Sequence, residues 1–196
     1  MNFRKALEWG GFGAGAVLIA FSIVAIAMGV NGRSTVRDSL KAEQIYFGSA
    51  ADPAVPAGLA GKLVDTGDRA RAMAKVMRTH TLESTKGQVY AEMGRFLDVN
   101  GEPTSDEDLA AKNPETGRPV ENAARNLWVT ETALSTALNT AYMAEQTALF
   151  GIVVGIALLL AGIGFIVLML FGGLRQPALA KSKEPVTGGP AQPTGV

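Results

Sequence analysis

Residues 148–173 read ALFGIVVGIALLLAGIGFIVLMLFGG and residues 10–30 read GGFGAGAVLIAFSIVAIAMGV, two apolar runs without a single charge. A helix needs about 20 apolar residues to cross a hydrocarbon layer of ~30 Å, whereas buried core helices usually carry runs of about 10–14. Both runs therefore predict transmembrane helices. The expected fold class is an all-α membrane protein with two spans.

The first run also has features of a cleaved signal peptide. Arg4 and Lys5 precede it, and Ala25-Ile26-Ala27 has the small residues of a cleavage site. The run is longer, however, than the usual apolar region of about 7–15 residues, and both alanines lie inside it. This pattern favours an uncleaved anchor.

Basic residues near the runs predict the orientation. The two tails carry five Lys and Arg, while residues 131–147 carry none. Because Lys and Arg favour the cytoplasmic side of a span, both tails are predicted inside. The expected organisation is a cytoplasmic N-tail (1–9), a transmembrane helix (10–30), an extracytoplasmic helical domain (31–147), a second transmembrane helix (148–173) and a disordered cytoplasmic tail (174–196).

The segment between the runs predicts helices joined by turn-rich linkers. Residues 33–47 extend the first span as a helix, and a loop rich in glycine and proline follows at 48–61. Asp65 is placed to cap the next helix. This helix ends near Lys86 and carries an amphipathic stripe of Ala70, Met73, Met77 and His80. Residues 87–99 fit either a short strand or a broken helix.

One long helix is predicted to end in the second span. Ser105 and Asp108 stand at capping-box spacing and predict a short helix before it, and Pro119 suits a first helical position. No glycine or proline interrupts residues 121–150. We therefore expect a continuous helix over about 120–171, its outer half packed on the 65–86 helix and on the extension of the first span. Its apolar stripe includes Leu127, Leu134 and Leu138.

Composition excludes several kinds of site. The chain has no cysteine and one histidine, which excludes thiolate metal sites, iron–sulfur clusters and heme held by two histidines. A net charge of zero provides no excess of positive charge for binding nucleic acid. The two apolar runs lack the ionisable residues on which proton relays and ion paths depend. We expect no cofactor, no metal, no nucleic-acid partner and no catalytic activity.

Glycines repeat along both apolar runs. Gly11 and Gly15 are four residues apart, as are Gly151 and Gly155, and Gly162 follows seven residues later. Such spacing allows helix backbones to approach closely in lipid. The glycine faces predict either contact with a partner subunit or second copy, or packing of the two spans on each other.

Two polar features contain residue types that bind metals. His80 has only Glu83 nearby on its helix face, and two ligands do not make a site. The acidic stretch 98–115 contains six Asp and Glu, but its glycine and acids do not follow the calcium-loop register. A surface or packing histidine and a solvated acidic face are the better interpretations.

Residues 70–96, ARAMAKVMRTHTLESTKGQVYAEMGRF, resemble a recurring segment of small two-pass actinobacterial membrane proteins. The resemblance continues in the N-L-W-x-x-x-x-A-L pattern from Asn126 to Leu134. Many members carry the name aromatic ring-opening dioxygenase. The resemblance implies an anchor, a helical outer segment and a second span. It implies no site residue. Extradiol ring cleavage uses iron held by two histidines and a carboxylate, whereas this chain has one histidine.

These features predict a non-catalytic accessory or assembly subunit of a bacterial plasma-membrane complex, such as an oxidoreductase or respiratory complex. Its expected partners are the lipid bilayer and either a larger membrane protein complex or further copies of the chain. The alternative is a membrane-anchored extracytoplasmic module that binds a ligand or senses a signal.

Overall fold

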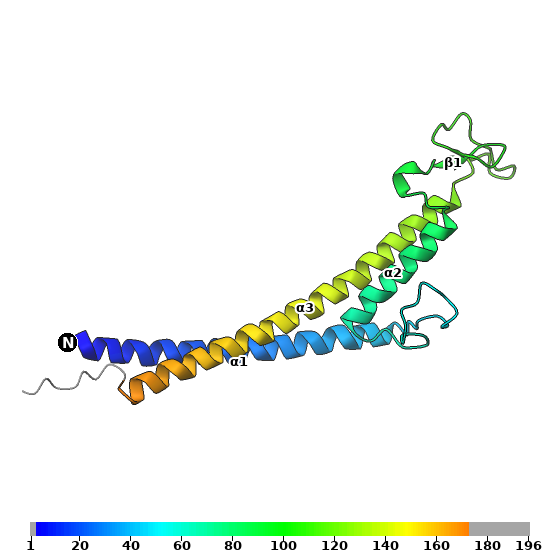
Figure 1. Ribbon diagram of the computed structural model, residues 1–196. Helices are drawn as coiled ribbons and strands as arrows, with labels where there is room; N and C mark the ends of the chain where they lie inside the picture. Colours follow the sequence, from blue (N-terminus) through cyan, green and yellow to red (C-terminus); the bar gives the residue numbers. More distant parts are fainter. Residues whose placement is uncertain (1–2, 173–196) are drawn as a thin grey trace, which may run out of the picture.

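Three α-helices form most of the computed structural model, which describes residues 3–172 (Figure 1). They are α1 (Phe3–Ala42), α2 (Gly67–Ser84) and α3 (Ala123–Leu170). The long helices α1 and α3 lie side by side and cross, and α2 packs along the outer half of α3. The prediction of a mostly helical chain with two long apolar helices is confirmed. The tail 174–196 lies outside the described residues.

Both long helices are long and apolar enough to cross a membrane. Their apolar side chains are largely exposed: Phe21 on α1 is 67% exposed and Leu160 on α3 is 66% exposed. Exposure of this kind differs from the core helix of a soluble protein, whose apolar face is covered by its neighbours. The surfaces of these helices are therefore suited to an apolar surrounding.

Helix α3 begins three residues later than predicted, at Ala123. The Asn122 side chain caps it by accepting a hydrogen bond from the N–H of Ala124. Pro119 does not begin the helix, as the sequence had suggested, because it pairs with Lys112 in an isolated β-bridge. The continuous helix into the second apolar run is confirmed, ending at Leu170.

Helix α2 is capped by Thr66 and not by Asp65. The Thr66 hydroxyl accepts from the N–H of Arg69, while the Asp65 carboxylate pairs with the Arg69 side chain. Ala70 and Met73 are buried against α3 as the stripe predicted. His80, at the far end of the stripe, is exposed.

The apolar core lies where the three helices meet outside the two apolar runs. The loop between α1 and α2 covers one side of this core. A β-bridge between Tyr46 and Leu63 and the hydrogen bond from the Val64 N–H to the Ile45 carbonyl hold the loop in place. The core consists of Leu40, Phe47, Val64, Ala70, Met73, Ala74, Val76 and Leu138.

A lobe of turns and short strands occupies the chain between α2 and α3. It contains the 3₁₀ turn η1 (Tyr90–Glu92) and the antiparallel strands β1 (Phe96–Leu97) and β2 (Pro103–Thr104). The open question over 87–99 is thus resolved as a turn followed by a strand. An all-α description misses this lobe, which lies at the far end of α3 (Figure 1).

The short helix predicted after Thr104 is wrong. Thr104 belongs to β2, and its hydroxyl accepts from the N–H of Asp106, whose carboxylate accepts from the N–H of Asp108. Such local bonds from short polar side chains compete with the helical hydrogen-bond pattern. The same residue types that suggested a capping box therefore form consecutive turns.

Candidate functional site: a charged junction and an apolar groove between the helices

Glycines on α1 and α3 lie where the two helices cross. A Cβ added at Gly155 would lie 2.6 Å from Ile26 Cγ1 and 3.1 Å from the Ser22 carbonyl oxygen. A Cβ at Gly162 would lie 2.8 Å from the carbonyl oxygen of Gly15. Ordinary side chains do not fit such distances to backbone atoms. These positions therefore allow the backbones of α1 and α3 to touch.

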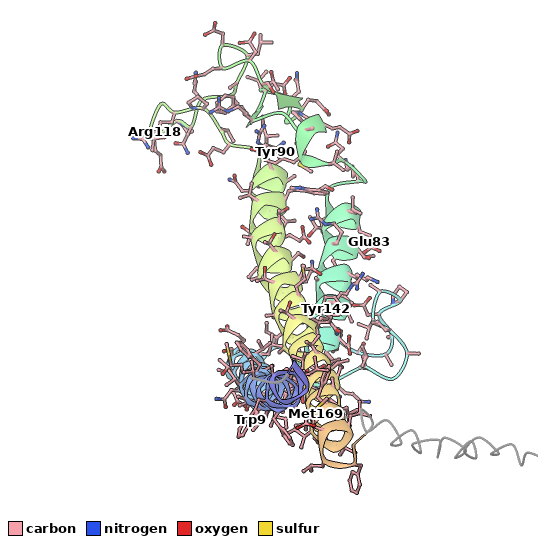
Figure 2. All side chains as sticks on the ribbon, turned by 90° about the vertical axis from the view of Figure 1, so that its left-hand side faces the viewer. Trp9, Glu83, Tyr90, Arg118, Tyr142 and Met169 are labelled. Atoms are coloured by element: carbon pink, nitrogen blue, oxygen red, sulfur yellow. The ribbon has the colours of Figure 1, made fainter. Side chains whose placement is uncertain are left out.

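The remaining predicted glycines, Gly11 and Gly151, differ in how closely the other helix approaches them. Gly11 faces the side chain of Met169, a residue near the end of α3 that is labelled in Figure 2. Gly151 has looser surroundings, with the Ala25 carbonyl oxygen 3.8 Å from an added Cβ. Gly29 was missed by the sequence pattern, although its added Cβ would lie 2.7 Å from the Ala148 carbonyl oxygen. The structure thus places this face in contact within the chain.

Glu145 joins all three helices just outside the apolar runs. Its Oε1 accepts from Nε of Arg33 at 2.9 Å and from Nε of Arg37 at 2.7 Å. Its Oε2 accepts from the N–H of Gly67, the first residue of α2. A carboxylate at this end of a helix also meets the positive end of the helix dipole. Glu145 is 6% exposed, so the junction consists of a buried carboxylate bonded to two partly exposed arginines and to the start of α2.

The pKa of Glu145 reflects this balance. Burial alone raises it, but the bonds from Arg33, from the Gly67 N–H and from Arg37 outweigh burial and lower the pKa below its ordinary value. The carboxylate is therefore charged at neutral pH. A charge held by two guanidinium groups is suited to fixing helix positions, and it is a poor proton donor or acceptor for catalysis.

A second buried carboxylate lies farther out on α3. Glu131 is 3% exposed, and its Oε2 lies 3.0 Å from Nη2 of Arg78 on α2. Its Oε1 accepts from the Ser135 hydroxyl. The Arg78 guanidinium also lies over the Trp128 ring at 4.5 Å. This second cluster fixes the register of α2 against α3.

Sequence reasoning missed both carboxylates. Glu131, Leu138 and Glu145 are spaced by seven residues and lie on the face of α3 that meets the other helices. The pattern that could have revealed them is a pair of acids placed seven residues before and seven residues after a core leucine, on one helix face. Arg33 and Arg37, at i and i+4 on α1, were the matching signal on the opposite side.

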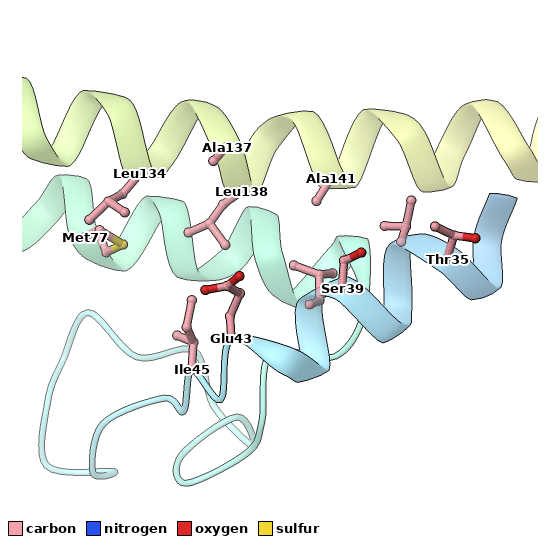
Figure 3. Close-up of a pocket in the computed structure, with 11 residues that line it drawn as sticks. Thr35, Ser39, Glu43, Ile45, Met77, Leu134, Ala137, Leu138 and Ala141 are labelled. Atoms are coloured by element: carbon pink, nitrogen blue, oxygen red, sulfur yellow. The ribbon is translucent and has the colours of Figure 1, made fainter.

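An apolar groove of about 670 Å³ opens where α1 ends and α3 continues (Figure 3). Val36 and Leu40 of α1 form one wall, and Met77 of α2 lies opposite. Leu134, Ala137, Leu138 and Ala141 line the side that belongs to α3. Most of the lining is apolar, and the groove lies on the outer side of the charged junction.

The predicted leucine stripe meets this groove in part. Leu138 is buried in the core, Leu134 is 49% exposed on the groove wall, and Leu127 is exposed beyond it. Glu43 lies at the same end of the groove as Ile45 and points toward α3 (Figure 3). Within residues 3–172, the Glu43 carboxylate has no ion-pair partner. The groove is therefore apolar with one unpaired negative charge.

His80 and the acidic stretch have structural contacts. His80 Nε2 lies 2.9 Å from Asp52 Oδ2, which ties α2 to the preceding loop. The Ala54 N–H, followed by His80, lowers the pKa of Asp52. In the acidic stretch, Asp98 accepts from the N–H groups of Asn100 and Glu102 in a tight turn. Over the described part of the chain, His, Asp and Glu form no cluster of three that could hold a metal.

Comparisons with protein-family models, with curated proteins and with solved structures found no significant match.

Proposed function

We propose that this chain is a non-catalytic accessory or assembly subunit of a larger protein complex in the bacterial plasma membrane. In this proposal α1 and α3 cross the bilayer through residues 10–30 and 148–173, with both tails inside and 31–147 outside. The exposed apolar surfaces of both helices support the membrane position. The resemblance to two-pass actinobacterial proteins supports the bacterial setting, and the basic residues of the tails support the orientation.

The apolar groove is the observation that carries the proposed role. The glycine faces are occupied by contact between α1 and α3, so they are not free for a partner at the crossing. Beyond Ala42, α1 stops while α2 and α3 continue, and this leaves their shared face without a third helix (Figure 1). An apolar helix of a partner subunit fits such a groove by ordinary helix-in-groove packing. A basic residue on that helix would pair with Glu43.

Photo-crosslinking tests this role. A photoreactive residue replaces Leu134 on the groove wall, and the matched control replaces Thr136, which is exposed two residues away on the same helix. The protein is expressed in its native host, irradiated and recovered in mild detergent. We expect one membrane protein to be crosslinked at 134 and not at 136. The crosslink should be lost in a Glu43→Lys background, because the charge pair becomes a repulsion.

Crosslinking that is equal at positions 134 and 136 would contradict the proposal. An unchanged yield of crosslinked partner in the Glu43→Lys background would show that Glu43 does not contribute to the contact. In the latter case the apolar wall alone would hold the partner.

The alternative of a ligand-binding module has one observation in its favour. The groove volume of about 670 Å³ lies within the range of small-molecule sites, about 300–1,000 Å³, and its lining is mostly apolar. An acyl chain would match that lining. Native mass spectrometry of the purified protein separates the two roles, because a bound lipid adds a defined small mass whereas an accessory subunit is recovered with a second protein.

A further inference from the structure

A second groove, on another face of the α2–α3 pair, has the opposite chemistry. Its volume is about 460 Å³, and its floor contains the buried Ala74 and Ser135. Arg71, Lys75 and Arg78 extend along its α2 side at i, i+4 and i+7. Residues at this spacing lie on one helix face. The groove therefore brings three cations together over a short distance.

The charges in this groove are not balanced within the described chain. Arg78 is neutralised by Glu131, but Arg71 and Lys75 form no ion pair among residues 3–172. This excess stands out because residues 31–147 carry 13 Lys and Arg against 16 Asp and Glu. Asp68 is the nearest acid along α2, three residues before Arg71, and it too forms no ion pair in the described structure. Two positive charges thus face the groove in a segment that is acidic overall.

The two guanidinium groups are held in place by aromatic rings. Arg71 lies over the Tyr142 ring at 4.7 Å, and Arg78 lies over Trp128 at 4.5 Å. Figure 2 shows Tyr142 on the part of α3 next to α2. A side chain that is already ordered loses less entropy when it binds a ligand. Stacking leaves the N–H groups of Arg71 available at the ring edge for an anion.

The neutral polar groups of the groove already have partners. The Ser135 hydroxyl donates to Glu131, the Asn139 amide donates to the Ser135 carbonyl, and the Thr79 hydroxyl donates to the Lys75 carbonyl. The positively charged donors of the groove that have no ion-pair partner in the described chain belong to Arg71 and Lys75. Recognition in this groove therefore rests on charge-assisted hydrogen bonds, which select an anion.

We propose that this basic groove binds the phosphate group of a phosphorylated ligand between Arg71 and Lys75. Side chains four residues apart on a helix have Cβ atoms about 5–6 Å apart, so both can converge on a single phosphate. Arginine supplies paired N–H donors that match phosphate oxygens, and lysine adds a point charge. The remaining volume accommodates the organic part of the ligand beside the Asn139 and Thr79 side chains.

The ligand comes from the aqueous phase if the chain has the proposed topology. Tyr142 and Ser135 stand six and 13 residues before the second apolar run, so the groove lies about 9–20 Å beyond it along the helix. The headgroup zone of one leaflet is only about 5–8 Å thick. Bilayer phosphates therefore lie below most of the groove. Phosphate binding by the purified protein does not itself depend on this topology.

Phosphorus NMR on the full-length protein in a zwitterionic, phosphate-free detergent tests the site. Inorganic phosphate and glycerol 3-phosphate are titrated separately, and hexaglutamate is used as a competing acidic peptide. We expect a saturable change in both phosphorus signals, with tighter binding of the ester. The double variant Arg71→Gln/Lys75→Gln should weaken binding at least tenfold. Lys86→Gln, which removes a positive charge outside the groove, should bind as the parent does.

The substitutions leave every ion pair of the described chain intact, so circular dichroism should show unchanged helicity. Absence of a saturable phosphorus signal change would overturn the proposal. So would equal binding by the double variant. Displacement of phosphate by hexaglutamate at lower concentration than by glycerol 3-phosphate would show that the groove prefers an acidic protein segment. Failure of the crosslinking test at Leu134 leaves this result unaffected, since the two grooves share no lining residue.

Discussion

Replacing Gly155 with leucine should separate α1 from α3. The Cβ alone would lie 2.6 Å from Ile26 Cγ1 and 3.1 Å from both the Ile26 nitrogen and the Ser22 carbonyl oxygen. The isoleucine side chain can rotate, but the two backbone atoms move only with the helix. Overpacking of this kind costs typically about 1–3 kcal/mol, and the size of leucine places Gly155→Leu near the upper value. The matched control is Gly164→Leu, because no atom lies within 4 Å of a Cβ added at Gly164.

Thermal unfolding of the purified protein in mild detergent measures the difference. For a chain of this size a loss of 1 kcal/mol lowers the melting temperature by roughly 2–4 °C. Gly155→Leu should therefore melt about 6–12 °C below the parent, by roughly 3 kcal/mol at that scale. Gly164→Leu should stay close to the parent, since open surface positions usually change stability by less than about 0.5 kcal/mol.

Equal melting temperatures for the two leucine variants would refute the inference that the glycine face packs within the chain. If Gly155→Leu melts normally and yet loses its partner in a detergent pull-down, the face would instead belong to the interface with that partner. A doubly substituted Gly155→Leu/Ile26→Ala chain offers a further check. It should recover only part of the loss, because the close approach to the Ser22 backbone remains.

Glu145→Gln should destabilise the protein by about 1–2 kcal/mol, measured by thermal unfolding. It removes the charge that pairs with Arg33 and Arg37, and the partial exposure of both guanidinium groups to solvent limits the loss. Because the pKa of Glu145 is lower in the folded protein, its contribution to stability is fully present above the ordinary pKa of a glutamate. That contribution is lost as the pH falls through the lower pKa of the folded state. Acid should therefore lower the melting temperature of the parent more than that of Glu145→Gln, and an equal acid response would contradict the assignment. Purified protein supplied with ferrous iron should neither bind iron stoichiometrically nor open catechol rings, and ring cleavage that disappears in His80→Ala would refute the non-catalytic proposal. A reporter active only in the cytoplasm should work when fused after Val196 and fail when inserted at Pro56, and the reverse result would overturn the proposed orientation.

The sequence by itself determined the long-range helical plan. Two charge-free runs of this length favour helices, and the absence of glycine and proline over 121–150 predicted that α3 continues from the outer segment into the second run. The stripe beginning at Ala70 and Met73 likewise predicted which face of α2 is buried. These features depend on local periodicity, which can be read in full from one continuous segment of the sequence.

Competing local hydrogen bonds limit what the sequence can predict at helix ends and in the lobe. Asp65 and Thr66 are both good capping residues, but in the structure Thr66 caps α2 while Asp65 forms an ion pair with Arg69. The residues after Thr104 are equally suited to a helix start and to turns, and pairing of β1 with β2 selected the turns. Strand pairing depends on a backbone partner elsewhere in the chain, and the local sequence pattern does not specify that partner.

Only the tertiary structure decided what the charged and small residues do. Arg33 and Glu145 are 112 residues apart, and their pairing depends on how α1 crosses α3. The choice of Gly15, Gly29 and Gly155 as close-contact positions, and of Gly164 as an open one, depends on the same crossing. The apolar groove exists because α1 ends at Ala42 while α3 continues past it. Relative helix lengths and crossing geometry arise from packing among distant segments, and no periodic pattern within one helix specifies them.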